Sequence, residues 1–120
     1  MISTAKAISY TILFTGIDGN SNFKTAEEAL NPAKIGFTTS ALPVKNLFFG
    51  EGPEHEQDWH NPPQPLFIII LSGVMQIETS GGEIKNFKSG DILLTEDRTG
   101  KGHRTRNLNG ELVSYLAFSK

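Results

Sequence analysis

The stretch "LFIIILSGVMQIETSGGEIKNFKSGDILLT" (66–95) decides the fold class. Residues 66–71 are apolar on both faces of a strand, which predicts a central strand covered by protein on each side. Residues 74–78 alternate apolar and polar side chains, and a glycine pair joins them to a second strand over 83–87, so a hairpin is expected. A further glycine turns the chain into 91–95. Short strands at this spacing predict an all-β fold.

Short strands are also expected on both sides of this stretch. Their ranges are 8–14, 35–40, 45–49, 103–108 and 111–118. With about nine or ten strands in all, the spacing is typical of a closed barrel or a sandwich.

One helical signal lies near the N-terminus. Thr25 is suited to cap a first turn, with Glu28 as its capping-box partner, but Pro32 limits the helix to about one turn and a half. We therefore expect at most one short N-terminal helical turn.

Length, charge and composition narrow the class of protein. The chain has 120 residues, which predicts one domain over 1–120. Its net charge is -2 and its basic residues are scattered, apart from Lys101, Arg104 and Arg106, so no nucleic-acid partner is expected. There is no cysteine, which fits a cytoplasmic protein. No run approaches the roughly twenty apolar residues of a membrane span, so no membrane partner is expected.

Histidines are the main candidates for chemistry. In "TEDRTGKGHRTRN" (95–107), the order of Gly, Lys and Gly before His103 differs from that of a phosphate-binding loop, and the following residues predict a strand rather than a helix. In "HEQDWH" (55–60), His55 and His60 are five positions apart, so this is not a zinc-protease helix motif. His55 is expected on the surface. His60 and His103 remain, each beside a predicted strand, and distant strands of a small barrel project alternate side chains into one interior.

Two segments resemble the sequence motifs of the cupins. They are "WHNPPQPLFIIILSG" (59–73) and "SGDILLTEDRTGKGHRTRN" (89–107). The resemblance implies a double-stranded β-helix, or jelly-roll barrel, whose cavity commonly holds a divalent metal. The residues that match are His60, Gly73, Gly90, Gly100, His103 and Asn107.

The departures from those motifs concern the metal ligands. Pro62 stands where the family has a second histidine, Leu66 where it has a glutamate, and Glu96 where proline is usual. The resemblance is closest to a set of short, uncharacterised bacterial cupins, seen also in "DGNSNF" (18–23) and in Trp59. That set has no common reaction, so the resemblance implies the fold rather than an activity.

Candidate site residues follow from the two histidines. If His60 points into the barrel, alternation places Pro62, Gln64 and Leu66 on the same face, so Gln64 is a further donor. Asp97 or Glu96 would supply a carboxylate from the loop before His103. The expected ligand-binding residues are His60, Gln64, His103 and Asp97. A divalent metal, if bound, would be Zn, Fe, Ni or Mn on His60, His103 and Gln64.

Three functions remain open, and the residues do not decide whether the chain is an enzyme. The first is binding of a small organic molecule in the barrel, the second a metal-dependent oxygenase or isomerase, and the third a non-catalytic assembly module. Each candidate residue also has an alternative role without chemistry. In that case His103 only forms a hydrogen bond with Asp97 and closes the barrel mouth, and Arg104 and Arg106 only line a solvent-exposed edge. The prolines would hold His60 at the start of a strand.

The surplus of apolar strand surface predicts a homodimer formed by sheet packing.

Overall fold

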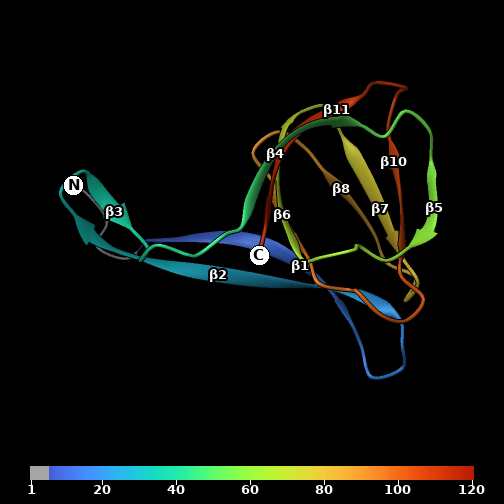
Figure 1. Cartoon of the computed structure of the whole chain (residues 1–120), viewed down its shortest axis with the longest axis horizontal. Coiled ribbons are helices and arrows are strands. Elements are labelled where there is room, and N and C mark those ends of the chain that lie inside the picture. Colours follow the sequence, from blue (N-terminus) through green and yellow to red (C-terminus); the bar gives the residue numbers. More distant parts are fainter. Residues whose placement is uncertain (1–5) are drawn as a thin grey trace.

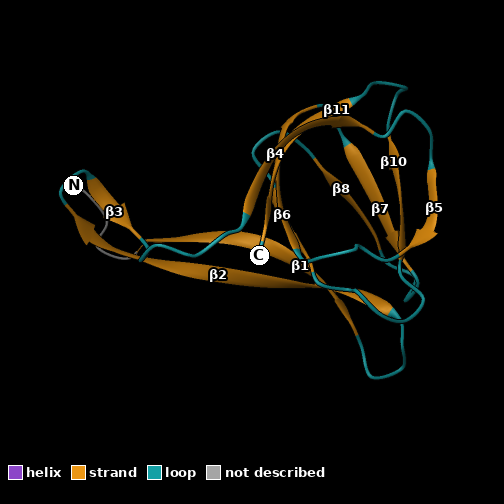
Figure 2. Cartoon of the chain, viewed as in Figure 1, coloured by secondary structure: helices purple, strands orange, loops and turns teal. Residues whose placement is uncertain are grey.

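Eleven β-strands and no helix make up residues 6–120, the part of the chain that the computed structural model describes (Figure 1, Figure 2). The described residues therefore include no helix of the length and apolar character needed to cross a bilayer. The strands are β1 (Lys6–Thr15), β2 (Ser21–Ala33), β3 (Gly36–Thr38), β4 (Asn46–Gly52), β5 (Gln57–His60), β6 (Leu66–Ser72), β7 (Met75–Thr79), β8 (Ile84–Phe87), β9 (Ile92–Thr95), β10 (His103–Asn107) and β11 (Val113–Ser119).

Strands β4 to β11 form a jelly-roll barrel. One sheet has the order β3-β2-β1-β9-β6-β11-β4 and the other the order β5-β10-β7-β8. From β4 onward, successive strands alternate between the two sheets, except that β7 and β8 are neighbours in the same sheet. This is the jelly-roll arrangement. The expected all-β barrel is confirmed by this strand order.

The stretch that predicted the fold occupies the expected places. Strand β6 lies between β9 and β11 and pairs with both, so it is central in its sheet. Strands β7 and β8 form the expected hairpin, in which Met75 faces Phe87. Strand β6 is less covered than expected: Ile70 is its only buried residue, Leu66 to Ile69 are half-buried, and Leu71 is exposed.

The helical turn expected at Thr25 is wrong, because residues 25–32 belong to β2. Here Thr25 faces Thr11 and Glu28 faces Ile8 across a long antiparallel pair with β1. That pairing satisfies backbone groups along the whole ten-residue length of β1, which a single helical turn would leave unpaired. Strand β1 also runs parallel to β9, so the hairpin extends the larger sheet. The end of the β1–β2 hairpin that lies next to β3 projects from the barrel in Figure 1.

A compact apolar core fills part of the space between the two sheets. Burial of each large side chain there stabilises the fold by about 1.5–3 kcal/mol. Phe23 of β2 packs edge-on against the buried Phe87, with ring centroids 6.0 Å apart, so the N-terminal hairpin is tied to the barrel. The core residues are Leu13, Ile70, Met75, Ile77, Phe87, Leu93 and Val113.

Candidate functional site

A cavity of about 580 Å³ occupies the remaining part of the barrel interior. Its walls are largely apolar and come from both sheets, with Ile68, Met75, Ile77 and Leu93 among them. A volume of this size and an apolar lining with a few polar groups are typical of small-molecule sites.

His60 and His103 lie side by side at this cavity. They are cross-strand partners on β5 and β10, and their ring centroids are 4.5 Å apart at an angle of 58°. Both line the cavity. Gly102 makes this approach possible, because its φ is +76° and a Cβ at this position would overlap the backbone of His60.

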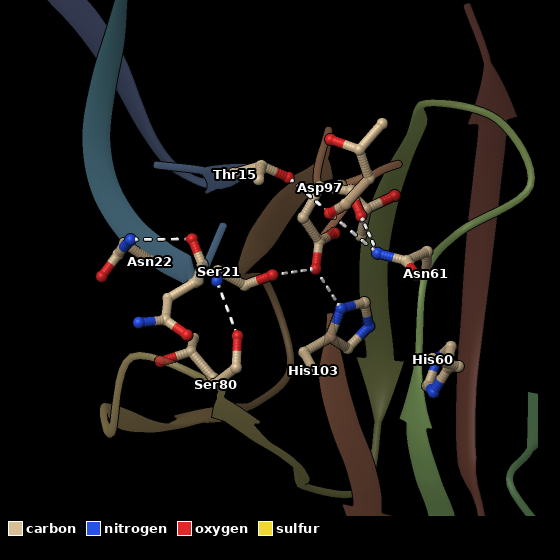
Figure 3. A network of polar contacts seen from close by, with 12 residues as sticks. Thr15, Ser21, Asn22, His60, Asn61, Ser80, Asp97 and His103 are labelled. Atoms are coloured by element: carbon tan, nitrogen blue, oxygen red, sulfur yellow. Dashed lines mark hydrogen bonds and ion pairs between the residues drawn. The ribbon is translucent and has the colours of Figure 1, made fainter. Parts of the chain in front are cut away.

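A buried carboxylate fixes the orientation of the His103 ring. His103 is only 4% exposed, and its Nδ1 lies 2.5 Å from Oδ2 of Asp97 (Figure 3). The Nδ1–H donates to the carboxylate, so in the neutral ring Nε2 carries a free lone pair. His103 therefore presents a hydrogen-bond acceptor on the side away from Asp97.

Asp97 is itself held by a serine from the other end of the chain. The hydroxyl of Ser21 donates to Oδ2 of Asp97 at 2.6 Å, and both residues are fully buried. The other carboxylate oxygen, Oδ1, is buried without a hydrogen-bond partner among residues 6–120. A single oxygen of Asp97, Oδ2, thus accepts hydrogen bonds from both His103 and Ser21.

Neighbouring turns keep this network in place. The backbone N–H of Ser21 donates to the hydroxyl of Ser80 at 2.7 Å, which joins the β1–β2 turn to the β7–β8 turn. Asn61 donates through its side-chain amide to the carbonyls of Asp97 and Thr99, at 2.8 and 3.0 Å, and so fixes the loop after β9 (Figure 3). Turns that are distant in sequence therefore meet around Asp97.

His60 has a fixed orientation too. Its Nδ1 lies 2.7 Å from the carbonyl oxygen of Asp58 and donates to it, which leaves the lone pair of the neutral ring on Nε2. The expected placement at the start of a strand is wrong, since His60 is the last residue of β5. The residues after His60 form the turn that leads to β6.

Gln64 lines the cavity, and so do Pro62 and Leu66, the residues expected on its face. The alternation of side chains along a strand does not explain why these residues line the cavity, because residues 61–65 form no strand and Pro63 lines the cavity as well. The chain wraps around the opening as a proline-rich turn instead.

The two carboxylates expected at the site, those of Asp97 and Glu96, do not line the cavity, although Glu51 does. Asp97 is not among the cavity-lining residues but sits behind His103, so the expectation that it contacts a ligand is not supported by its position. The Glu96 carboxylate faces away and pairs with Lys120 at 3.4 Å. The hydrogen bond between His103 and Asp97, expected as the alternative role without chemistry, is present.

The residues at the cavity do not fit a catalytic metal. Such sites take three or four protein ligands, and residues 6–120 contain no cluster of three His, Cys, Asp or Glu side chains that could hold an ion. His60 and His103 supply two nitrogens, and Gln64 adds a weak neutral oxygen. These two strong donors are fewer than such a site needs.

The basic residues of β10 lie on the outer face of its sheet. Arg104 donates to Glu78 at 2.8 Å, and its guanidinium lies 4.9 Å from the ring centroid of Trp59. The bond to Glu78 raises the pKa of Arg104. Arg106 donates to Gln76 at 2.6 Å. Both arginines are engaged outside the cavity, as on a solvated sheet face.

Sequence reasoning missed several residues of the site. Ser21 and Asn61 carry no sequence signal, because serine and asparagine are ordinary turn residues. Tyr115 and Thr105 also line the cavity, and alternation from Val113 and from His103 was a sufficient signal to find them.

Comparisons with known proteins add a fold neighbour. No protein-family model matches the sequence, and no curated protein matches it. The chain is similar to a cupin domain. This solved structure is the Schizosaccharomyces pombe Cnp3 cupin domain, with 12% identity, a TM-score of 0.45, and coverage of 99% of this chain and 86% of that one. The jelly-roll assignment stands on the strand order described above.

Proposed function

We propose that the barrel binds a small organic molecule in the cavity beside His60 and His103. The observation that carries this proposal is a largely apolar cavity of about 580 Å³ at which two imidazoles of fixed orientation lie together. Apolar walls supply binding energy, and a few fixed polar groups supply selectivity.

The lining indicates the chemistry of the ligand. Among the described residues, the cavity lining includes no lysine or arginine, so an anion would have no permanent positive charge to meet. Both neutral imidazoles accept hydrogen bonds through Nε2. Glu51 also lines the cavity, where it is exposed and would repel an anion. We therefore assign the ligand an uncharged, mainly apolar body and at least one polar group, such as a hydroxyl, that donates.

Saturation-transfer NMR with 2-naphthol as the probe tests this binding. Ile68 lines the cavity on β6, so I68W fills it and is expected to abolish the transfer. Leu71 lies on the same strand, is 48% exposed and does not line the cavity, so L71W is the matched control and retains the transfer. Transfer that is equal in both variants would contradict binding inside the barrel.

A further inference from the structure

We propose that His103 is a general base that acts without a metal on an uncharged carbonyl compound with an acidic C–H bond. This inference rests on the proposed function, because it assigns a reaction to the molecule bound in the same cavity. Four features of the structure carry it: three involve His103 or the groups that hold it, and the fourth is a hydrogen-bond donor at the same cavity.

The first feature is the position of the lone pair. Donation from Nδ1 to Asp97 at 2.5 Å sets the tautomer, so that in the neutral ring of His103 the lone pair is on Nε2. The ring lines the cavity although only 4% of the residue is exposed. A base in such a position meets a bound molecule but little bulk water.

The second feature is the buried carboxylate behind the ring. Asp97 is fully buried, and its Oδ1 has no partner within the described part of the chain. A carboxylate in this environment strongly favours a positive charge beside it. Proton uptake at Nε2 creates that charge on the His103 ring, so Asp97 stabilises the imidazolium that the reaction forms.

The third feature is the rigidity of the pair. Ser21 donates to the same carboxylate oxygen at 2.6 Å and is itself anchored to Ser80. Asp97 and Ser21 do not line the cavity, so they are positioning residues. Such support keeps a base aligned at low reorganisation cost.

The fourth feature is a hydrogen-bond donor at the same cavity. The ring of Tyr115 packs over its cross-strand partner Gly50, where any Cβ would overlap it. Tyr115 lines the cavity, and its phenolic hydroxyl is a hydrogen-bond donor. This hydroxyl is available to the carbonyl oxygen of a bound molecule.

The proposed step needs no further reactant. The C–H bond next to the carbonyl breaks, its proton goes to Nε2 of His103, and its electron pair forms a C=C bond as the carbonyl becomes an enolate. The hydroxyl of Tyr115 donates to the enolate oxygen. In a β,γ-unsaturated carbonyl compound the enolate is conjugated with the second C=C bond, and the imidazolium returns the proton to the γ-carbon, so the net reaction is an isomerisation that moves the C=C bond.

Elimination of 5-nitrobenzisoxazole tests the base directly. This uncharged aromatic probe needs only a base: its C–H proton goes to Nε2, the electron pair forms a nitrile, and the ring N–O bond breaks to release a coloured phenolate. We expect H103Q to lower kcat by about 10²-fold. His55 lies in an exposed loop, so H55Q is the matched control and is expected to leave the rate unchanged.

D97N tests the positioning role. The asparagine amide donates to Nδ1, which moves the ring proton to Nε2 and removes the lone pair from the cavity. We expect kcat to fall at least about tenfold with little change in KM. Long-range ¹H–¹⁵N NMR should show the proton of His103 on Nδ1 in the parent chain and on Nε2 in D97N. A D97N variant that has the parent tautomer and the parent rate would overturn the role of Asp97.

Equilibrium dialysis of the probe separates the possible failures. If the probe binds but H103Q eliminates it as fast as the parent chain, the base is wrong and binding in the cavity stands. If the probe does not bind, the uncharged substrate class is wrong. If naphthol binding is also lost from the parent chain, the proposed function itself fails.

Discussion

Gly102 lies directly against the backbone of His60, with no room between them for a side chain. This contact sets the distance between β5 and β10, and through it the distance between the two imidazoles. The relative placement of His60 and His103 therefore depends on a residue that has no chemistry of its own.

Replacing this glycine should separate the strands. We expect G102A to lower the free energy of unfolding by about 1–3 kcal/mol beyond the backbone strain of a positive φ. Gly110 has a similar φ of +69° and nothing near its missing Cβ, so G110A reports the strain alone. Urea unfolding measures both variants. Equal losses would show that the contact with His60 is unimportant.

Loss of the serine that holds the buried carboxylate should destabilise the fold. S21A removes a donor from a fully buried, charged acceptor, and we expect a loss of roughly 1.5–3 kcal/mol. Ser9 bonds Glu27 at 3.4 Å on the exposed surface, so S9A is the same chemical change at a site where little should be lost. Thermal and urea unfolding compare the two. An S21A variant as stable as S9A would contradict a stabilising role for this bond.

Chelator treatment should leave the protein unchanged. Two imidazoles and an amide are too few donors for a tightly held divalent ion, so we expect no change in Tm with EDTA. Elemental analysis of protein purified without chelator should find zinc, iron, nickel and manganese well below one ion per chain. Near-stoichiometric metal that disappears in H60A or H103A would restore the metalloenzyme alternative.

The turn between β1 and β2 should make stability depend on pH in the acid range. The backbone N–H and side-chain amide of Asn20 donate to the Asp18 carboxylate, each at 3.0 Å, and the backbone bond is the main cause that lowers the pKa of Asp18 below its ordinary 3.8. A lowered folded-state pKa means that the unfolded chain binds the proton more readily. The stabilisation is thus present above pH 3.8 and is lost as the pH falls through the folded-state pKa.

The comparison with D18N isolates this contribution. The parent chain should be slightly more stable than D18N near neutral pH, and the difference should shrink as the pH falls below 3.8. Urea unfolding at a series of pH values measures the difference. A difference that grows toward low pH would have the wrong sign.

We also propose that two copies of the chain associate through strand β4. Within residues 6–120 this strand is at a sheet edge and pairs only with β11. Leu47, Phe48 and Phe49 remain 48%, 45% and 80% exposed, and Phe48 and Phe49 also line the cavity. Adjacent residues of a strand face opposite ways, so both faces of this edge are apolar and uncovered. Light scattering should give about twice the chain mass of 13.1 kDa.

L47D should shift the mass toward that of one chain. Ile84 is 60% exposed on β8, the edge of the other sheet, so I84D adds the same charge away from β4 and should leave the mass unchanged. A parent chain that scatters as a single copy would rule out the dimer.

The sequence by itself determined most strands of the barrel, but it did not predict β2 or β5. Alternation and glycine turns act between residues that are close in the chain, so the hairpin of β7 and β8 and the central place of β6 could be read directly. The error at Thr25 arose where a local capping signal competed with a long pairing partner, β1, that only the folded chain brings alongside.

The site was decided by tertiary structure. That His60 and His103 face one cavity follows from the register of β5 and β10, and the tautomer of His103 follows from its contact with Asp97, which Ser21 holds from 76 residues away. Cross-strand register and burial depend on how the whole sheet packs, and no local pattern of residues encodes them. The two histidines could therefore be identified from the sequence, whereas the orientation of each ring depends on the fold.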